Sequence, residues 1–193
     1  MSGAGTSTGV GTGSGAGAGG GAPLRIAILG AESTGKSTLA DALARRYRTL
    51  WVPEYLREFV DDRQRVPFED DQPAIARTQL AREDAMAARP EARRFLFCDT
   101  TPLLTAVYSR IYWGRVPPEL LALEAAHDYA LTLVAAPDLP WVPDGLQRES
   151  AEVRMRVHAQ LVAVLAERGI PYVLVEGELE ARMRKVELLL PTL

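Results

Sequence analysis

The segment G-A-E-S-T-G-K-S at residues 30–37 constrains the fold of this chain more than any other feature. It matches the pattern G-x-x-x-x-G-K-[ST] at every fixed position, and an apolar run at residues 24–29 precedes it. In such a loop the glycines let backbone N–H groups turn inward onto phosphate oxygens, and the following helix adds the positive end of its dipole. The pattern therefore predicts a strand, a phosphate-binding loop and a helix over residues 24–48.

Two side chains of this loop have specific predicted roles. Lys36 is one of two lysines among 22 basic residues, and its compact ammonium suits the β- and γ-phosphates of a nucleotide better than a planar guanidinium does. Ser37 is expected to place its hydroxyl on Mg²⁺. The loop thus predicts binding of ATP or GTP, with ATP and Mg²⁺ as the expected cofactors. The residues expected to bind the nucleotide are Gly30, Ala31, Glu32, Ser33, Thr34, Gly35, Lys36, Ser37 and Thr38.

Short apolar runs alternate with helical segments along the rest of the chain. Strands are expected at residues 24–29, 50–52, 94–98, 129–134 and 171–175. The longer segments between them are rich in helix formers and end at Pro or Gly, as at Gly169. This alternation predicts an α/β fold with a parallel sheet, helices on both faces, and ligands beyond the carboxyl ends of the strands.

Composition separates a tail from one folded domain and narrows the classes of function. Residues 1–22 are nearly all Gly, Ala, Ser and Thr, so we expect a flexible tail before a single domain at residues 23–193. The formal net charge of −3 disfavours a nucleic-acid partner. The lone cysteine, Cys98, excludes an intramolecular disulfide framework, and no apolar run is long enough to span a membrane. We therefore expect a cytoplasmic protein with a small-molecule substrate.

An acidic residue follows the strand expected at residues 94–98. Asp99 occupies the position at which a Walker B carboxylate holds the water shell of Mg²⁺. The alternative is that Asp99 caps the following helix, but Thr100 and Thr101 can serve as caps equally well. We therefore assign Asp99 to the metal.

A second acidic residue, Glu54, follows the strand expected at residues 50–52 and begins the stretch E-Y-L-R-E-F. In a small-molecule kinase a carboxylate within hydrogen-bond reach of the acceptor hydroxyl can take its proton. Glu54 is our preferred base over Glu58 and Asp99, and Arg57, one turn further on, is expected to hold the substrate or the transferring phosphoryl group. The alternative is a solvated helix start with an ion pair between Glu54 and Arg57.

Residues 137–148 are dense in Pro, Asp and Gly, which is typical of an exposed loop at the position of a lid over ATP. Arg148 is expected to bring its charge to the transferring phosphoryl group, with Arg154 and Arg156 as reserves on the next helix. Trp141 either stacks on an aromatic ring of the substrate or anchors the loop. The other arginines are expected on solvated helix faces, for example Arg45, Arg77 and Arg182.

Four segments together resemble a known family. They are G-A-E-S-T-G-K-S at residues 30–37, E-Y-L-R-E-F at 54–59, D-T-T at 99–101 and W-V-P-D-G-L-Q-R at 141–148. In order and spacing they resemble the ribosylnicotinamide kinase domain of NadR-type proteins over nearly all of residues 24–193. The resemblance implies a P-loop kinase fold whose five-stranded parallel sheet has the order 2-3-1-4-5, with a lid loop.

The resemblance also implies an activity, namely transfer of the γ-phosphoryl group of ATP to the 5′-hydroxyl of nicotinamide riboside, giving nicotinamide mononucleotide. NadR-type proteins can also carry adenylylating and DNA-binding domains, which the resemblance does not cover, so neither activity is expected here. The implied catalytic residues are Lys36, Glu54, Asp99 and Arg148. The implied substrate contacts are Glu54, Tyr55, Arg57, Asp99, Trp141 and Asp144, and the implied metal ligands are Ser37 and Asp99.

Two other functions remain open on the residues alone. A kinase of another nucleoside fits, because an acid after the second strand and a lid arginine also suit deoxynucleoside kinases. A nucleotide-binding ATPase switch that acts through a partner fits the phosphate loop as well. Fast ATP hydrolysis without an acceptor would favour the switch.

Overall fold

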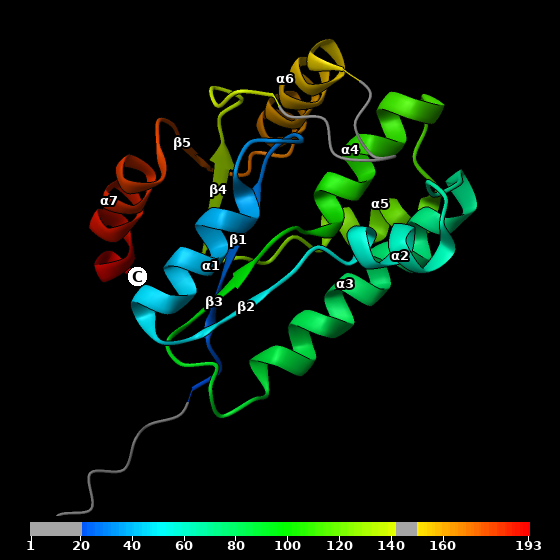
Figure 1. Cartoon of the computed structure of the whole chain (residues 1–193). Coiled ribbons are helices and arrows are strands. Elements are labelled where there is room, and N and C mark those ends of the chain that lie inside the picture. Colours follow the sequence, from blue (N-terminus) through cyan, green and yellow to red (C-terminus); the bar gives the residue numbers. More distant parts are fainter. Residues whose placement is uncertain (1–20, 142–149) are drawn as a thin grey trace, which may run out of the picture.

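The sheet of this protein has five parallel strands in the order β2-β3-β1-β4-β5 (Figure 1). The computed structural model describes residues 21–141 and 150–193. The strands are β1 Leu24–Leu29, β2 Leu50–Val52, β3 Phe95–Cys98, β4 Leu131–Ala135 and β5 Val173–Val175. The predicted fold class and strand order are confirmed. Most of the predicted tail, and the lid residues Asp144 and Arg148, lie outside the described residues.

The central strand β1 pairs with β3 on one side and β4 on the other. Its sequence L-R-I-A-I-L is almost wholly apolar because helices cover both faces of the sheet, and its last four residues are buried. In the registers, Ala27 lies opposite both Cys98 of β3 and Thr132 of β4. Because all strands run the same way, the loops that follow β1, β2, β3 and β4 gather at one edge of the sheet.

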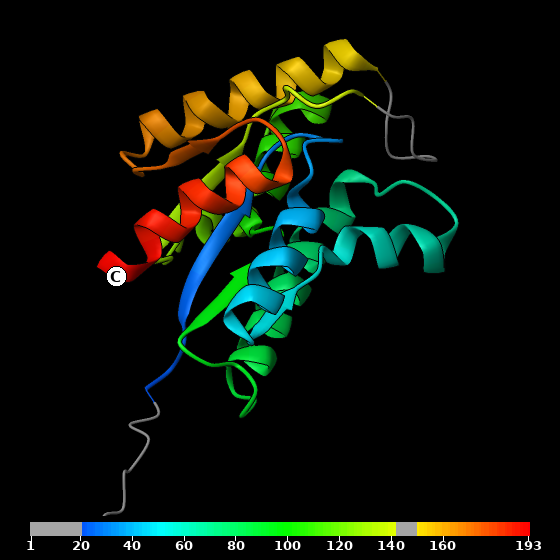
Figure 2. The ribbon, with the colours of Figure 1, turned by 60° about the vertical axis from the view of Figure 1, so that its left-hand side comes forward.

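Helices connect the strands and cover the sheet in two layers (Figures 1 and 2). Those of α type are α1 Lys36–Tyr47, α2 Tyr55–Arg63, α3 Gln72–Ala87, α4 Pro102–Trp113, α5 Pro118–Ala125, α6 Ala151–Glu167 and α7 Leu179–Leu189; the short 3₁₀ helices are η1 Glu69–Asp71 and η3 Leu190–Thr192. Helices α1 and α7 pack on one face of the sheet, and α3, α4 and α6 pack on the other.

Alternate residues of β1 belong to the two halves of the core. Ile26 and Ile28 pack against Leu39 and Leu43 of α1 and Val186 of α7. The neighbouring side chains of the strand pack against α4 and α6 on the opposite face. This two-sided burial holds the carboxyl end of β1, and the loop that follows it, in a fixed place.

The predicted element bounds differ from the observed ones by a few residues. The fourth strand begins at Leu131 rather than at residue 129, and the Tyr129 hydroxyl before it hydrogen-bonds a buried carboxylate. Thr101 takes the N-cap position of α4, but its hydroxyl oxygen accepts no hydrogen bond from the backbone N–H groups of the first turn. Neither threonine hydroxyl caps this helix, and Asp99 does not cap it either, because its Oδ2 accepts from Ser37 and its Oδ1 has no hydrogen-bond partner among the described residues.

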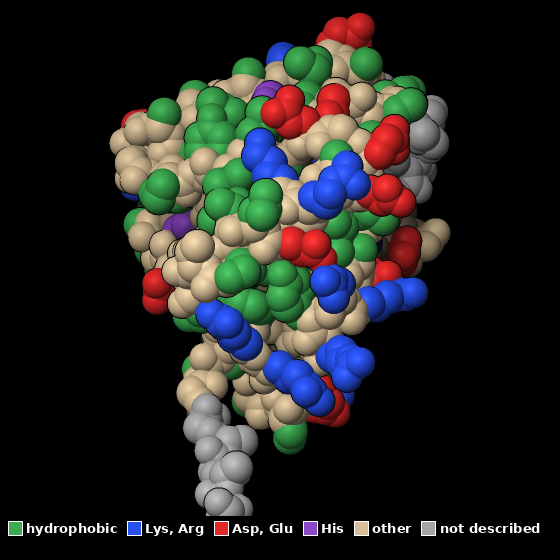
Figure 3. Space-filling model, turned by 90° about the vertical axis from the view of Figure 1, so that its left-hand side faces the viewer, with side chains coloured by type: hydrophobic (Ala, Val, Ile, Leu, Met, Phe, Trp, Pro, Cys, Tyr) green, Lys and Arg blue, Asp and Glu red, His purple; other side chains and the backbone are tan. Residues whose placement is uncertain are grey.

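The surface over α1 and α7 carries basic and acidic side chains next to one another (Figure 3). Arg46 of α1 pairs with Glu187 of α7 at 2.6 Å, and Arg45 pairs with Asp41 at 3.0 Å. Arg45 and Arg77 are exposed, as predicted. Among the described residues, no helix combines the length and the apolar character needed to cross a bilayer.

A buried carboxylate on α3 lies under the sheet, away from the phosphate loop. The hydroxyl of Tyr129 donates to both oxygens of Glu83, at 2.8 and 3.0 Å, and Arg25 stands 3.6 Å away. Burial raises the pKa of Glu83 to about 7, and the Tyr129 hydrogen bonds, the charge of Arg25 and the Cys98 thiol oppose this only in part; Asp84 adds to the rise.

Replacing Glu83 with Gln is expected to remove part of the pH dependence of stability. Because the pKa in the folded state lies above the unfolded value, the stabilising contribution of the protonated group is complete below about pH 4.5 and is lost as the pH rises through about 7. The wild-type free energy of unfolding should fall relative to that of Glu83→Gln by on the order of 3 kcal/mol over this range. Urea titrations at a series of pH values measure the free energy of unfolding of both proteins. The same dependence of this free energy on pH in both would contradict the prediction.

Candidate nucleotide and acceptor site

The loop between β1 and α1 is fixed by contacts with its own backbone and with β4. Gly30 has φ +150°, and a Cβ there would stand 2.8 Å from Thr34 Oγ1 and 2.9 Å from the Ala135 carbonyl oxygen. The Thr34 hydroxyl and the Lys36 ammonium both donate to the Ala31 carbonyl, at 2.8 and 2.9 Å. The loop is thus a closed turn seated directly on the end of β4.

The predicted metal ligands lie side by side at the ends of α1 and β3. The hydroxyl of Ser37 donates to Asp99 Oδ2 at 2.6 Å, while Asp99 Oδ1 is buried and has no hydrogen-bond partner among the described residues. Burial raises the pKa of Asp99 to about 6, and the charge of Glu54 adds to the rise, whereas Lys36, Ser37 and Arg57 lower it.

These oxygens fit Mg²⁺. The Ser37 hydroxyl and the Asp99 carboxylate, whose Oδ1 has no hydrogen-bond partner among the described residues, are hard oxygen donors. Mg²⁺ binds such donors together with substrate phosphates and water. Within residues 21–141 and 150–193, no group of three or more His, Cys, Asp or Glu side chains forms a metal site by itself. Ser37 and Asp99 would therefore hold the ion jointly with phosphate oxygens.

A cavity of about 330 Å³ opens beside Lys36, between α2, α3 and α4. Its polar lining includes Glu32, Glu54, Arg57 and Gln79. Several buried polar atoms of lining residues have no hydrogen-bond partner among the described residues: Glu32 Oε2, Gln79 Nε2 and Thr100 Oγ1. Because buried polar groups are normally hydrogen-bonded, these atoms indicate a polar ligand.

The predicted catalytic residue Glu54 lines this cavity from the start of α2. Its side chain is 10% exposed, and its Oε2 lies 3.5 Å from Nε of Arg57. The ion pair that the sequence offered as an alternative to catalysis is therefore present: its carboxylate is largely buried in the cavity lining, whereas the Arg57 side chain is 46% exposed. The charge of Glu54 also raises the pKa of Asp99, which follows β3 just outside the cavity lining.

The aromatic side of the cavity was not predicted. It comes from α4, through Tyr108, Tyr112 and Trp113. The rings of Tyr108 and Tyr112 are stacked, with centroids 6.1 Å apart and planes 12° apart. Burial, together with the nearby charges of Glu32 and Glu54, raises the pKa of Tyr108 well above its usual range, so its hydroxyl stays protonated and hydrogen-bonds Glu32. The spacing Y-x-x-x-Y-W was the available signal, because residues four apart share a helix face.

Three other predicted substrate residues, Tyr55, Asp99 and Trp141, lie outside the cavity lining. Tyr55 packs edge-on against Phe59 and lies under the guanidinium of Arg82, and its N–H donates to Gln79 at 2.9 Å. Trp141 is half-buried, and its indole nitrogen has no hydrogen-bond partner among the described residues. Tyr55 therefore contributes by placing Gln79.

The predicted reserve arginines separate into a buried and an exposed residue. Arg154 is buried, and its Nη2 donates to the Leu139 carbonyl at 2.7 Å. Burial lowers the pKa of Arg154, with Asp138 and Glu32 opposing that shift. Arg156 is exposed on α6. Arg154 thus holds the segment after β4 next to the phosphate loop.

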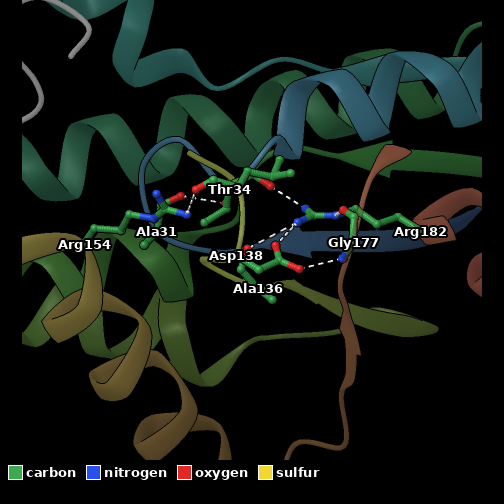
Figure 4. Close-up of polar contacts among 8 residues, drawn as sticks. Ala31, Thr34, Ala136, Asp138, Arg154, Gly177 and Arg182 are labelled. Carbon is green, nitrogen blue, oxygen red and sulfur yellow. Dashed lines mark hydrogen bonds and ion pairs between the residues drawn. The ribbon is translucent and has the colours of Figure 1, made fainter. Parts of the chain in front are cut away.

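The prediction for Arg182 is wrong. Its side chain is 2% exposed rather than on a solvated helix face, and its guanidinium hydrogen-bonds groups after β1, β4 and β5 (Figure 4). The reason is a long-range contact: α7 lies against α1, so its first turn faces the phosphate loop. A lone helical arginine in the sequence gives no sign of this.

The parallel sheet, the seated phosphate loop and the Ser37–Asp99 pair define a nucleotide-binding protein with a P-loop kinase fold. The chain belongs to the AAA_28 family of AAA domains, whose model matches residues 25–182. The predicted resemblance to NadR-type proteins is confirmed.

The chain is 33% identical over 172 residues to the trifunctional NAD biosynthesis/regulator protein NadR of Salmonella typhimurium, and 34% identical over 160 residues to that of Escherichia coli. These matches cover 84% and 79% of this chain but 41% and 38% of the relatives, so the chain spans less than half the length of either.

Solved structures share the fold. A NadR protein in complex with NR matches with a TM-score of 0.73 at 23% identity, over 87% of this chain and 49% of that chain. A deoxyadenosine kinase from M. mycoides matches with a TM-score of 0.60 at 11% identity, over 88% of this chain and 100% of that chain.

Gly30→Ala is expected to abolish nucleotide binding, because the added Cβ would clash with Thr34 Oγ1 and with the Ala135 carbonyl. Gly114→Ala is the matched control: φ there is +67°, but a Cβ would meet nothing within 4 Å. The control should lose only about 1 kcal/mol of stability from backbone strain. Calorimetric titration with ADP, beside thermal melting, measures both effects. A folded Gly30→Ala protein with wild-type ADP affinity would refute this account of the loop.

Proposed function

We propose that this protein is a nicotinamide riboside kinase, which transfers the γ-phosphoryl group of ATP to the riboside 5′-hydroxyl and so forms nicotinamide mononucleotide. The observation that carries the proposal is the cavity at the phosphate loop, which combines stacked aromatic rings with carboxylates. The names of the relatives support it, since both are NAD biosynthesis proteins and one related structure holds NR.

The cavity lining suits the nicotinamide ring, which is an aromatic cation. The faces of tyrosine and tryptophan rings attract cations, and Tyr108, Tyr112 and Trp113 line one side. Glu32 and Glu54 add negative charge within the same lining. A neutral base would gain the stacking but not the attraction of charge.

The unpartnered polar atoms suit the sugar. Ribose hydroxyls both donate and accept hydrogen bonds, so they can satisfy Glu32 Oε2, Gln79 Nε2 and Thr100 Oγ1 together. A wholly apolar ligand of the same size would leave these groups buried and unsatisfied, which costs about 1–3 kcal/mol for each. The donors and acceptors of the lining therefore favour a nucleoside over an apolar acceptor.

Each predicted catalytic residue has a role in the proposed transfer. Glu54 accepts the proton of the riboside 5′-hydroxyl while the hydroxyl oxygen forms a bond to the γ-phosphorus of ATP. The bond between the γ-phosphorus and the β,γ-bridging oxygen breaks at the same time, and ADP is released. Arg57 holds the Glu54 carboxylate in place, and Lys36 binds the phosphates. Ser37 and Asp99 would hold Mg²⁺, which would neutralise phosphate charge.

The residues outside the described part of the chain keep the roles that the resemblance implies. Arg148 would bring positive charge to the transferring phosphoryl group, and Asp144 would face the riboside. Trp141, which is the last described residue before this segment, is also proposed to face the riboside. The relatives are named as trifunctional NAD biosynthesis/regulator proteins, and this chain spans less than half of their length, so adenylylation and DNA binding are not part of the proposal.

Release of ADP by the purified protein with MgATP tests the proposal. We expect rapid release with nicotinamide riboside and at least tenfold slower release with uridine, adenosine or deoxyadenosine at equal concentration, because these bases are neutral. If only a neutral nucleoside stimulated ADP release, the protein would still be a kinase, but nicotinamide riboside would not be its substrate. Release that ignores every acceptor would favour the ATPase switch.

Glu54→Gln is expected to lower kcat about 100-fold or more, because the amide cannot accept the hydroxyl proton, while the KM for ATP changes little. The control is Glu58→Gln, one turn along α2, whose side chain is half-exposed and pairs with Arg82 outside the cavity. Steady-state kinetics with saturating riboside compare the two. Turnover near wild type in Glu54→Gln would remove Glu54 from the mechanism.

A further inference from the structure

The Arg182 side chain joins three loops at the carboxyl edge of the sheet (Figure 4). Its Nε donates to the Gly177 carbonyl at 2.7 Å, and its Nη1 donates to the Thr34 carbonyl at 2.5 Å. Its Nη2 donates to Asp138 Oδ1 at 2.5 Å and, more weakly, to the Ala136 carbonyl at 3.4 Å. Every nitrogen of this buried guanidinium therefore has an acceptor.

The contact with Thr34 fixes one peptide group of the phosphate loop. In a trans peptide the C=O and the following N–H point in opposite directions. Because Arg182 holds the Thr34 carbonyl from behind the loop, the Gly35 N–H is turned to the opposite side. Gly35 also begins α1, since its carbonyl accepts from the Leu39 N–H at 3.0 Å. The turned amide thus joins the N–H groups at a helix start, which are the groups that bind phosphate.

The position of Gly35 shows how closely the guanidinium backs the loop. Gly35 has φ +75°, and a Cβ there would lie 3.7 Å from Arg182 Nη1 and 3.0 Å from Leu139 Cδ1. Because glycine has no Cβ and accepts a wide range of backbone angles, Gly35 by itself does not fix the direction of this peptide, and an external contact restricts it. Arg182 supplies that contact from α7.

The charge of Arg182 is balanced within the same cluster. Asp138 accepts from Arg182 through Oδ1 and from the Gly177 N–H through Oδ2 at 2.5 Å. With its charge paired in this way, the guanidinium acts through the direction of its N–H groups rather than through net charge. A lysine has a single nitrogen and cannot reproduce the three-way fork.

We propose that Arg182 is a positioning residue of the phosphate loop: by holding the Thr34 carbonyl, it aims the Gly35 amide at the phosphates of the bound nucleotide. The inference rests on the nucleotide binding that the proposed function also requires, but not on any acceptor. Binding experiments without an acceptor therefore separate its failure from failure of the kinase proposal.

The test measures dissociation constants for ADP and AMP by calorimetry in Arg182→Lys. The ratio of the AMP dissociation constant to the ADP dissociation constant reports how much the β-phosphate contributes to binding affinity. We expect this ratio to fall about tenfold, because hydrogen bonds to charged groups contribute about 1.5–3 kcal/mol each. A loss of stability alone would lower the melting temperature and leave the ratio unchanged. A folded Arg182→Lys protein with the wild-type ratio would overturn the proposal.

Two control variants separate the Thr34 contact from other effects. Arg184→Lys changes an exposed arginine of the same helix and should leave the ratio within twofold of wild type. Asp138→Asn removes the ion pair but keeps the Thr34 contact, so it should lower stability and also leave the ratio within twofold. If the ratio fell equally in Asp138→Asn and Arg182→Lys, the ion pair rather than the contact with the Thr34 carbonyl would be responsible for phosphate binding, and the proposal would be overturned.

A measurement on the wild-type protein covers the case in which Arg182→Lys does not fold. The ¹⁵N–¹H resonance of Gly35 should move downfield when ADP is added, as an amide does when it donates to a phosphate oxygen. Saturation with ADP that leaves the Gly35 resonance in place would overturn the proposal. Absence of any ADP binding would instead count against nucleotide binding, and with it against the proposed function.

Discussion

The close approach of the phosphate loop to the end of β4 is the constraint on which the rest of the site depends. Gly30 lies so near Thr34 and the Ala135 carbonyl that no side chain fits there. With the loop seated on the sheet, α1 starts at a fixed point, and Ser37 meets Asp99 at 2.6 Å. The predicted metal ligands and the start of α1 are thus placed by the close approach of the loop to β4.

The cavity next to this loop combines aromatic side chains with carboxylates. Stacked rings from α4 form one side, while Glu32 of the phosphate loop and Glu54 at the N-cap of α2 contribute carboxylates to the lining that also includes Lys36. The burial that raises the pKa of Asp99 and Tyr108 also strengthens every charge interaction within the site. An acceptor that is both cationic and hydroxylated matches more of these groups than a neutral or an apolar one.

The sequence predicted those parts of the structure that depend on local pattern. The phosphate loop, the carboxylates after β2 and β3, and the strand order implied by family resemblance all rest on short motifs, and the fold agrees with them. The aromatic side of the cavity could not be predicted, because the face of α4 that turns toward the cavity depends on how α2, α3 and α4 pack. Arg182 lies 148 residues from Thr34 along the chain, so its contact follows from α7 docking beside α1 and not from any local pattern. The roles of Asp144 and Arg148 stay predictions.

The product of the reaction tests the central claim most directly. A ³¹P NMR spectrum of the protein with MgATP and nicotinamide riboside should show a new phosphomonoester resonance, coupled to the 5′ protons, that grows at the same rate as ADP. Inorganic phosphate growing with ADP, with no phosphomonoester, would show that water rather than the riboside accepts the phosphoryl group, and would contradict the assignment of the cavity as an acceptor site.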